Sequence, residues 1–112
     1  MRKRIALIAA VAVAAAAAAT AHAATKSVKV GDNWFVKAKG VPTVTVNRGD
    51  TVRWQWVGER PHNVRVQSGP VRFASKVQES GTFSRRMTRS GTYTIICVVH
   101  GASDQKMTLR VR

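Results

Sequence analysis

Side chains that bind soft metal ions are few in this sequence, and three of them suggest a single site. The chain has one cysteine, Cys97, and His100 follows it by three positions, while His62 lies in an earlier segment. One thiolate with two imidazoles is the in-plane ligand set of blue-copper electron-transfer sites, which a weak axial Met, Gln or backbone oxygen completes. An isolated buried cysteine usually acts as a small hydrophobe. It is the joint occurrence of the three residues that predicts a copper site.

The single cysteine also excludes several other kinds of protein. It cannot form an internal disulfide, so no disulfide framework holds this fold. It cannot by itself supply an all-cysteine zinc site or an iron–sulfur cluster. The 112 residues favour one small domain over a large multidomain enzyme.

The elements that must position these ligands are predicted to be strands. Apolar and polar residues alternate with period 2 through most of the chain, and Gly, Asn, Asp and Ser mark the turns. Val52, Trp54 and Trp56 share one face and are predicted to fill the core. Residues 71–79 have the weakest pattern and are expected to form a loop or one short helical turn. The strands are predicted at 27–30, 43–46, 51–57, 63–67, 82–87, 92–98 and 106–111, with Trp34 and Phe35 in a further extended segment. About seven to eight strands predict an all-β fold, either an antiparallel sandwich or a small barrel.

Residues 1–23 have the features of a secretory signal peptide. Residues 2–4 are basic, an alanine-rich apolar stretch follows, and residues 21–23 read Ala-His-Ala. We expect cleavage after Ala23, a domain over residues 24–112, and export to the periplasm, the cell envelope or the extracellular space. The alternative is a retained membrane anchor, although a spanning helix needs about 20 strongly apolar residues. An exported thiol is prone to oxidation unless something shelters it, and a bound metal would do so.

Four stretches of the sequence resemble the cupredoxins of the plastocyanin, amicyanin and pseudoazurin group. The resemblance implies a Greek-key β-sandwich that holds one type 1 copper through His62, Cys97 and His100. It further implies that Asn63 ties the two ligand loops together by hydrogen bonds, and that the ring edge of His100 reaches the surface. It implies an electron carrier rather than an enzyme. The matching stretches are residues 46–54, 61–64, 80–84 and 91–100.

The axial ligand is where the sequence departs from the cupredoxin pattern. Family members have a Met a few residues after the second His. In this sequence the position with plastocyanin-like spacing is occupied by Gln105, and the position with amicyanin-like spacing by Ser103. The one Met in this region, Met107, alternates with Leu109 and would face the core if the last strand begins before Thr108. Gln105 is therefore the first candidate, Met107 the alternative, and Ser103 the third.

The charge of the chain suggests its partners. The whole sequence carries +14; without the basic head, 16 basic and 5 acidic side chains remain, a formal charge of +11. The electric field of this positive charge accelerates encounter with negatively charged partners. We therefore expect the partner to be an acidic redox protein or an anionic envelope surface, and we expect no binding to a specific nucleic acid. The protein itself is expected to be a monomer. Two rivals remain: a module that delivers or buffers copper, and a metal-free basic sandwich that binds polyanions.

Overall fold

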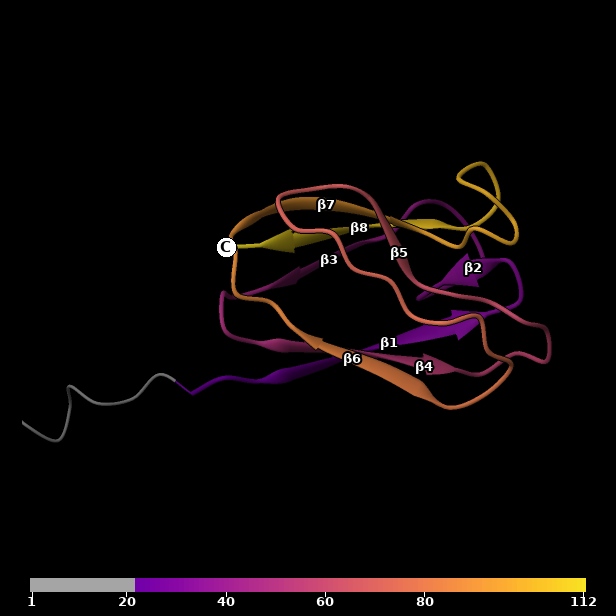
Figure 1. Ribbon diagram of the computed structural model, residues 1–112, viewed down its shortest axis with the longest axis horizontal. Coiled ribbons are helices and arrows are strands. Elements are labelled where there is room, and N and C mark those ends of the chain that lie inside the picture. The colour runs from indigo at the N-terminus through magenta and orange to yellow at the C-terminus, as the bar shows by residue number, and fades with distance from the viewer. Residues whose placement is uncertain (1–21) are drawn as a thin grey trace, which may run out of the picture.

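The alternating segments form two four-stranded sheets that pack face to face (Figure 1). The computed structural model describes residues 22–112. Within that range eight strands occur, and the prediction of an all-β sandwich is confirmed. They are β1 (Thr25–Gly31), β2 (Trp34–Phe35), β3 (Thr43–Val46), β4 (Thr51–Trp56), β5 (Arg65–Ser68), β6 (Thr82–Arg86), β7 (Gly91–Ile96) and β8 (Lys106–Val111).

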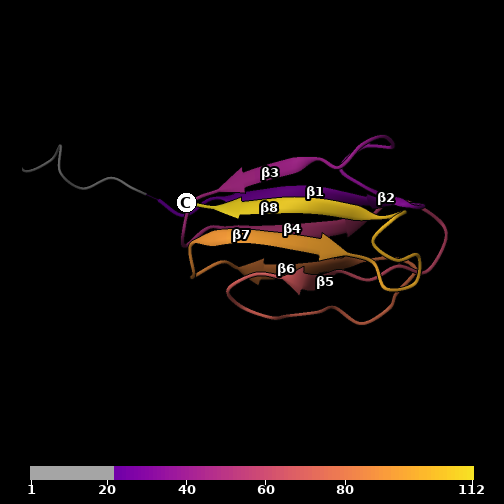
Figure 2. The same cartoon turned by 90° about the horizontal axis from the view of Figure 1, so that it is seen from above.

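One sheet has the strand order β2-β1-β4-β6 and the other the order β3-β8-β7-β5. β1 runs parallel to β4, and β3 runs parallel to β8, while the remaining pairs are antiparallel. Figure 2, which views the molecule from above, shows the strands of one sheet lying over those of the other, with both sets running along the long axis. The chain therefore crosses repeatedly from one sheet to the other, which brings loops from distant segments to the same end.

The core lies between the sheets and is built from the inward face of each alternating strand. Val52, Trp54 and Trp56 all point inward from β4, as predicted, and Trp54 is completely buried. The Trp54 ring packs 6.0 Å from that of Phe73 and 5.8 Å from that of Phe83, measured between centroids. This aromatic contact joins the two sheets, because Phe83 comes from β6 and Phe73 from the segment beside β5.

Residues 71–79 form a loop, the first of the two alternatives that the sequence predicted. They form no helical turn and lie extended beside β5, with isolated bridges from Arg65 to Ala74 and from His62 to Gln78. The amide of His62 donates to the carbonyl of Gln78, and the amide of Gln78 donates back, both at 3.0 Å. This pairing, and the use of Asn63 in a loop contact, delay the start of β5 to Arg65, two residues later than expected.

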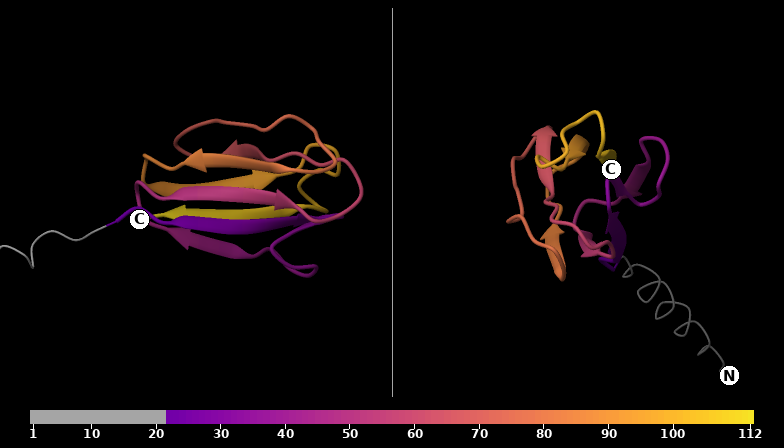
Figure 3. Two further views of the ribbon diagram at one scale, coloured as in Figure 1. Left: turned by 90° about the horizontal axis from the view of Figure 1, so that it is seen from below. Right: turned by 90° about the vertical axis from the view of Figure 1, so that its right-hand side faces the viewer.

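The two ends of the sandwich have different loops. The right-hand panel of Figure 3 looks onto the end that carries the β1–β2 turn, the β4–β5 connection and the β7–β8 loop. At the other end, the Asp50 carboxylate closes the β3–β4 turn by accepting hydrogen bonds from the amides of Ala24 and Asn47, each at 2.9 Å. These bonds lower the pKa of Asp50 below its ordinary 3.8.

The predicted signal peptide falls almost wholly in residues 1–21, outside the described residues, and stays a prediction. Residues 22–112 contain no helix with the length and apolar character needed to cross a membrane.

Candidate metal centre

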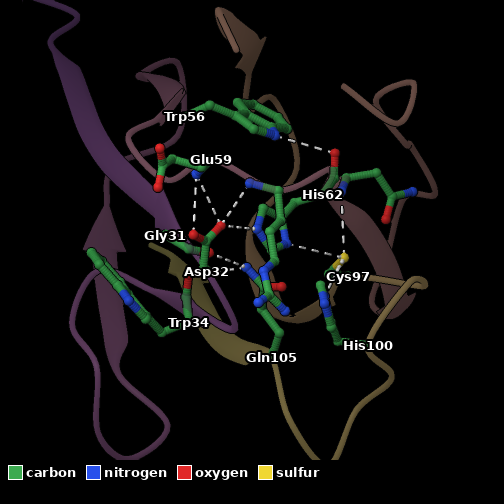
Figure 4. Close-up of polar contacts among 11 residues, drawn as sticks. Gly31, Asp32, Trp34, Trp56, Glu59, His62, Cys97, His100 and Gln105 are labelled. Carbon is green, nitrogen blue, oxygen red and sulfur yellow. Dashed lines mark hydrogen bonds and ion pairs between the residues drawn. The ribbon is translucent and has the colours of Figure 1, made fainter. Parts of the chain in front are cut away.

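Three metal-binding side chains meet at the loop end of the sandwich (Figure 4). Cys97 directly follows β7, His100 lies in the β7–β8 loop, and His62 comes from the β4–β5 connection. The Cys97 sulfur lies 3.7 Å from Nδ1 of His100 and 4.0 Å from Nδ1 of His62. The ligand atoms of all three lie within 4.8 Å of one another, so one ion can contact them together.

The β7–β8 loop that carries Cys97 and His100 is closed by its own backbone. The amide of Cys97 donates to the carbonyl of Gln105 at 3.2 Å, which extends the β7–β8 pairing by one step. Inside the loop, the amide of Gly101 donates to the Cys97 carbonyl at 2.8 Å, and the amide of Gln105 donates to the Gly101 carbonyl at 3.1 Å. The left-handed conformation of Gly101, with φ of 80°, allows this tight return. His100 is thereby held beside Cys97.

Asn63 links the two ligand loops, in the role that the cupredoxin resemblance implied. Its side-chain Oδ1 accepts a hydrogen bond from the amide of Val98 at 2.8 Å, and its own amide donates to the Cys97 sulfur at 3.4 Å. Asn63 is buried. The Asn63 backbone therefore holds the sulfur that would bind the metal, and its side chain holds the start of the loop that carries His100.

The outer nitrogen of the His62 ring is held by Asp32, a residue of the β1–β2 turn. Nε2 of His62 lies 2.8 Å from Oδ1 of Asp32, and the same carboxylate accepts the amides of Arg60 at 2.9 Å and Glu59 at 3.1 Å. The hydrogen bond from His62, followed by those from Arg60 and Glu59, lowers the pKa of Asp32 from 3.8 to about 2. An ionised carboxylate only accepts, so Nε2 is the donor in this contact, and Nδ1 is the ring nitrogen that faces Cys97.

The three candidates for the axial position occupy different environments. Gln105 is fully buried opposite Cys97, and its Nε2 donates to the carbonyls of Gly31 at 3.2 Å and Trp34 at 3.0 Å. Its Oε1 is buried and has no hydrogen-bond partner. Met107 lies inside β8, paired with Ile95, and is fully buried within the core. Ser103 is exposed.

These residues fit a copper ion. The two histidine nitrogens and the cysteine sulfur would hold the ion, and the unpartnered Oε1 of Gln105 is a buried acceptor at the same end of the sandwich. A buried carbonyl oxygen without a partner costs free energy unless something binds it, and a metal ion would.

Comparison with known proteins agrees with this geometry. The family described as "Copper binding proteins, plastocyanin/azurin family" matches residues 24–112. The chain belongs to the plastocyanin/azurin family of copper-binding proteins. A plastocyanin of Dryopteris crassirhizoma is 28% identical over 85 residues, covering 62% of this chain and 83% of the relative. In fold, the chain is similar to a Met-to-Gln mutant of amicyanin in its Cu(I) form, with TM-score 0.66 and 24% identity, covering 79% of this chain and 82% of amicyanin. An oxidised Met-to-Leu amicyanin mutant gives TM-score 0.65 and 24% identity, over 87% of this chain and 89% of the other.

As a member of this family, the protein is a blue copper protein with one type 1 site, and it carries single electrons to and from redox partner proteins. Copper, when bound, supplies the one-electron Cu(II)/Cu(I) couple. The protein is an electron carrier and not an enzyme. Its own residues hold the donors in place through the loop closure, the Asn63 link and the Asp32 contact, so little has to rearrange when the charge of the site changes.

The sequence did not predict the contacts that Asp32 and Trp56 make with His62. Asp32 had the signature of an ordinary turn residue, because Asn33 and nearby Gly31 marked a turn there. Trp56 was assigned to the core alone, whereas its indole Nε1 also donates to the carbonyl of His62 at 3.2 Å. A carboxylate in a turn that precedes a histidine by 30 residues gives no local signal, since only the parallel pairing of β1 and β4 brings the two together.

Proposed function

We propose that this blue copper protein is an exported electron carrier in which the amide oxygen of Gln105 is the axial ligand. The observation that carries the axial assignment is the orientation of the Gln105 amide. Both hydrogen bonds of its nitrogen go to backbone carbonyls of the β1–β2 hairpin, and its oxygen is buried and has no hydrogen-bond partner. In Figure 4 the Gln105 side chain is drawn below His62 and beside His100.

The surroundings of Met107 support this ranking. Met107 remains the alternative, but its strand begins at Lys106, so it lies one inward-facing position deeper in the core than Gln105. A methionine inside a buried strand packs as a core residue. Because an amide oxygen is harder than a thioether, Gln105 favours Cu(II) over Cu(I) and should lower the reduction potential.

Voltammetry and electron paramagnetic resonance of the copper-loaded protein test the assignment. Gln105→Met should raise the reduction potential and change the copper hyperfine pattern, whereas Met107→Leu should leave both unchanged. A shift in Met107→Leu together with none in Gln105→Met would assign the axial position to Met107 instead.

Electrons are proposed to pass through His100, which is partly exposed beside two exposed apolar residues, Val98 and Val99. A small apolar surface permits close contact with a partner, and the charge of +11 on residues 24–112 suits an acidic one. The rate of electron transfer to an acidic acceptor protein should fall steeply as ionic strength rises. An electron-transfer rate that does not depend on ionic strength would show that the partner does not need to be acidic.

Export with cleavage after Ala23 is supported by the contact between Ala24 and Asp50. The nitrogen of Ala24 donates to the buried Asp50 carboxylate. After cleavage that nitrogen would be the α-amino group, and a charged donor makes a stronger hydrogen bond to a carboxylate than an amide does. The intact mass of the protein recovered from the periplasm or the medium tests this point: a mature species beginning at Ala24 supports it, and a full-length species found with membranes supports the retained anchor.

A further inference from the structure

We propose that Asp32 is a positioning residue for the copper site, which fixes the His62 ring with Nδ1 toward the metal and places a negative charge behind that ligand. The inference rests on the His62, Cys97 and His100 copper site and is independent of which residue is axial. It concerns a residue outside the ligand set, carried by the β1–β2 turn (Figure 4).

The backbone and the ring of His62 are held by different contacts. The backbone is held by the paired hydrogen bonds with Gln78 and by the Trp56 indole, which donates to the His62 carbonyl. None of these contacts touches the imidazole. On the side of the ring away from Cys97, the polar contact is the 2.8 Å one between Nε2 and Oδ1 of Asp32. Asp32 therefore sets the ring and its tautomer, while the fold sets the backbone.

The Asp32 carboxylate is itself anchored, so it can hold the ring in one orientation. Its Oδ1 accepts the amide of Arg60 and its two oxygens share the amide of Glu59, each within 3.1 Å. These two amides belong to the loop that leads into His62. The β1–β2 turn and the His62 loop are thus joined at one carboxylate, whose side chain is 35% exposed while that of His62 is fully buried.

The neighbouring chain leaves space for this carboxylate. A Cβ atom at Gly58 would lie 2.4 Å from Oδ1 and 2.7 Å from Cγ of Asp32, which is closer than non-bonded atoms approach. Glycine at position 58 therefore allows the carboxylate to come in against the loop. Its requirement here is space, and Gly58→Ala should displace Asp32 from the ring.

A carboxylate on the outer nitrogen changes what the histidine offers to a metal. It fixes the tautomer, orients the ring and raises the basicity of the ligating nitrogen. Its negative charge also favours the more highly charged Cu(II) over Cu(I). Removal of such an outer partner typically lowers metal affinity by about 10- to 100-fold.

The experiment compares Asp32→Asn, Asp32→Ala and the control Asp50→Asn in two measurements. Asp32→Asn removes the charge but retains an oxygen that can accept from Nε2, whereas Asp32→Ala removes both. Asp50→Asn removes an equal charge, from a carboxylate that also accepts two backbone amides, at the opposite end of the sandwich. The metal-free protein is examined by ¹⁵N NMR of the His62 ring, and Cu(II) affinity is measured by competition with a chelator.

The expected results differ between the variants. Metal-free wild type and Asp32→Asn should have His62 protonated at Nε2, and Asp32→Ala should show a mixture of tautomers. Cu(II) affinity should fall by roughly 10- to 100-fold in Asp32→Ala, and by a smaller factor in Asp32→Asn, with no change in Asp50→Asn. The reduction potential should rise in both Asp32 variants.

An unchanged tautomer in Asp32→Ala, together with an affinity equal to that of the Asp50→Asn control, would overturn the inference. Should Asp32→Ala fail to fold, the affinity and potential of Asp32→Asn decide: values matching the control overturn it. The NMR measurement needs no copper, so failure of the copper site itself would appear separately, as loss of Cu(II) binding by the wild type.

Discussion

The hydrogen bond between Asn63 and Val98 should stabilise the metal-free protein, and Asn63→Ala is the change that tests it. Oδ1 of Asn63 accepts the Val98 amide at 2.8 Å, and the side chain is buried. The contact between the Asn63 amide and the Cys97 sulfur is made by the backbone and remains available in the variant. The substitution therefore isolates the side-chain link between the two ligand loops.

The loss of unfolding free energy in Asn63→Ala can be worked out from the hydrogen bond that is removed and the amide that loses its acceptor. A net hydrogen bond contributes about 0.5–1.5 kcal/mol, and a partly buried Val98 amide without an acceptor adds to the loss, so we expect about 1–2 kcal/mol in total. For a domain of this size, 1 kcal/mol corresponds to roughly 4–8 °C in Tm, so Tm should fall by about 4–16 °C.

The assay is thermal and urea unfolding of the metal-free protein, followed by circular dichroism. Asn47→Ala is the matched control, because Asn47 is an exposed asparagine at the opposite end, and its side chain makes no hydrogen bond within residues 22–112. If Asn63→Ala unfolds at the same temperature as Asn47→Ala, the side chain does not hold the ligand loops together and the reasoning fails.

Three further predictions follow from other contacts. Tyr93→Phe removes the hydrogen bond from the Tyr93 hydroxyl to the carbonyl of Arg89, at 2.8 Å, and should lower the free energy of unfolding by about 0.5–1.5 kcal/mol in urea titrations; no loss would mean that water replaces the bond. Because the pKa of Asp50 is lowered below 3.8 in the folded protein, its contribution to stability should be complete above that pH and disappear as the pH falls through the folded value. The difference in stability between wild type and Asp50→Asn should therefore close below pH 3.8, and a gap independent of pH would contradict this. Cys97→Ser should abolish the intense visible absorption on addition of Cu(II) while the far-ultraviolet circular dichroism of the metal-free protein stays unchanged; a blue Cys97→Ser protein would place the thiolate ligand elsewhere.

Strands in which apolar and polar residues alternate regularly could be predicted from the sequence. The inward face of β4, with Trp54 and Trp56, and the late strands around Cys97 follow from period-2 burial, since each strand has one face in the core. Cys97 and His100 were also predictable as a pair, because a short loop must keep residues three apart close together.

The parts that could not be predicted depend on contacts between distant segments. The start of β5 is set by the pairing of His62 with Gln78, and the weak periodicity of residues 71–79 gave no sign of it. Asp32 reaches His62 only because β1 lies beside β4 in the sheet. The free oxygen of Gln105 depends on two backbone carbonyls in the β1–β2 hairpin, and a sequence pattern does not show which amide group will be satisfied.

The closed loop between Cys97 and Gln105 makes part of the copper site a replaceable unit. Its two ends are joined by the hydrogen bond from the Cys97 amide to the Gln105 carbonyl, directly beyond the last pair of β7 and β8. Within the loop, Gly101 donates to Cys97 and accepts from Gln105. The rest of the domain holds this loop at its two ends and at Val98, whose amide donates to Asn63. An exchange of residues 99–104 for a loop of another length should therefore leave β7 paired with β8 while it moves His100 relative to His62 and changes the exposure of this ligand.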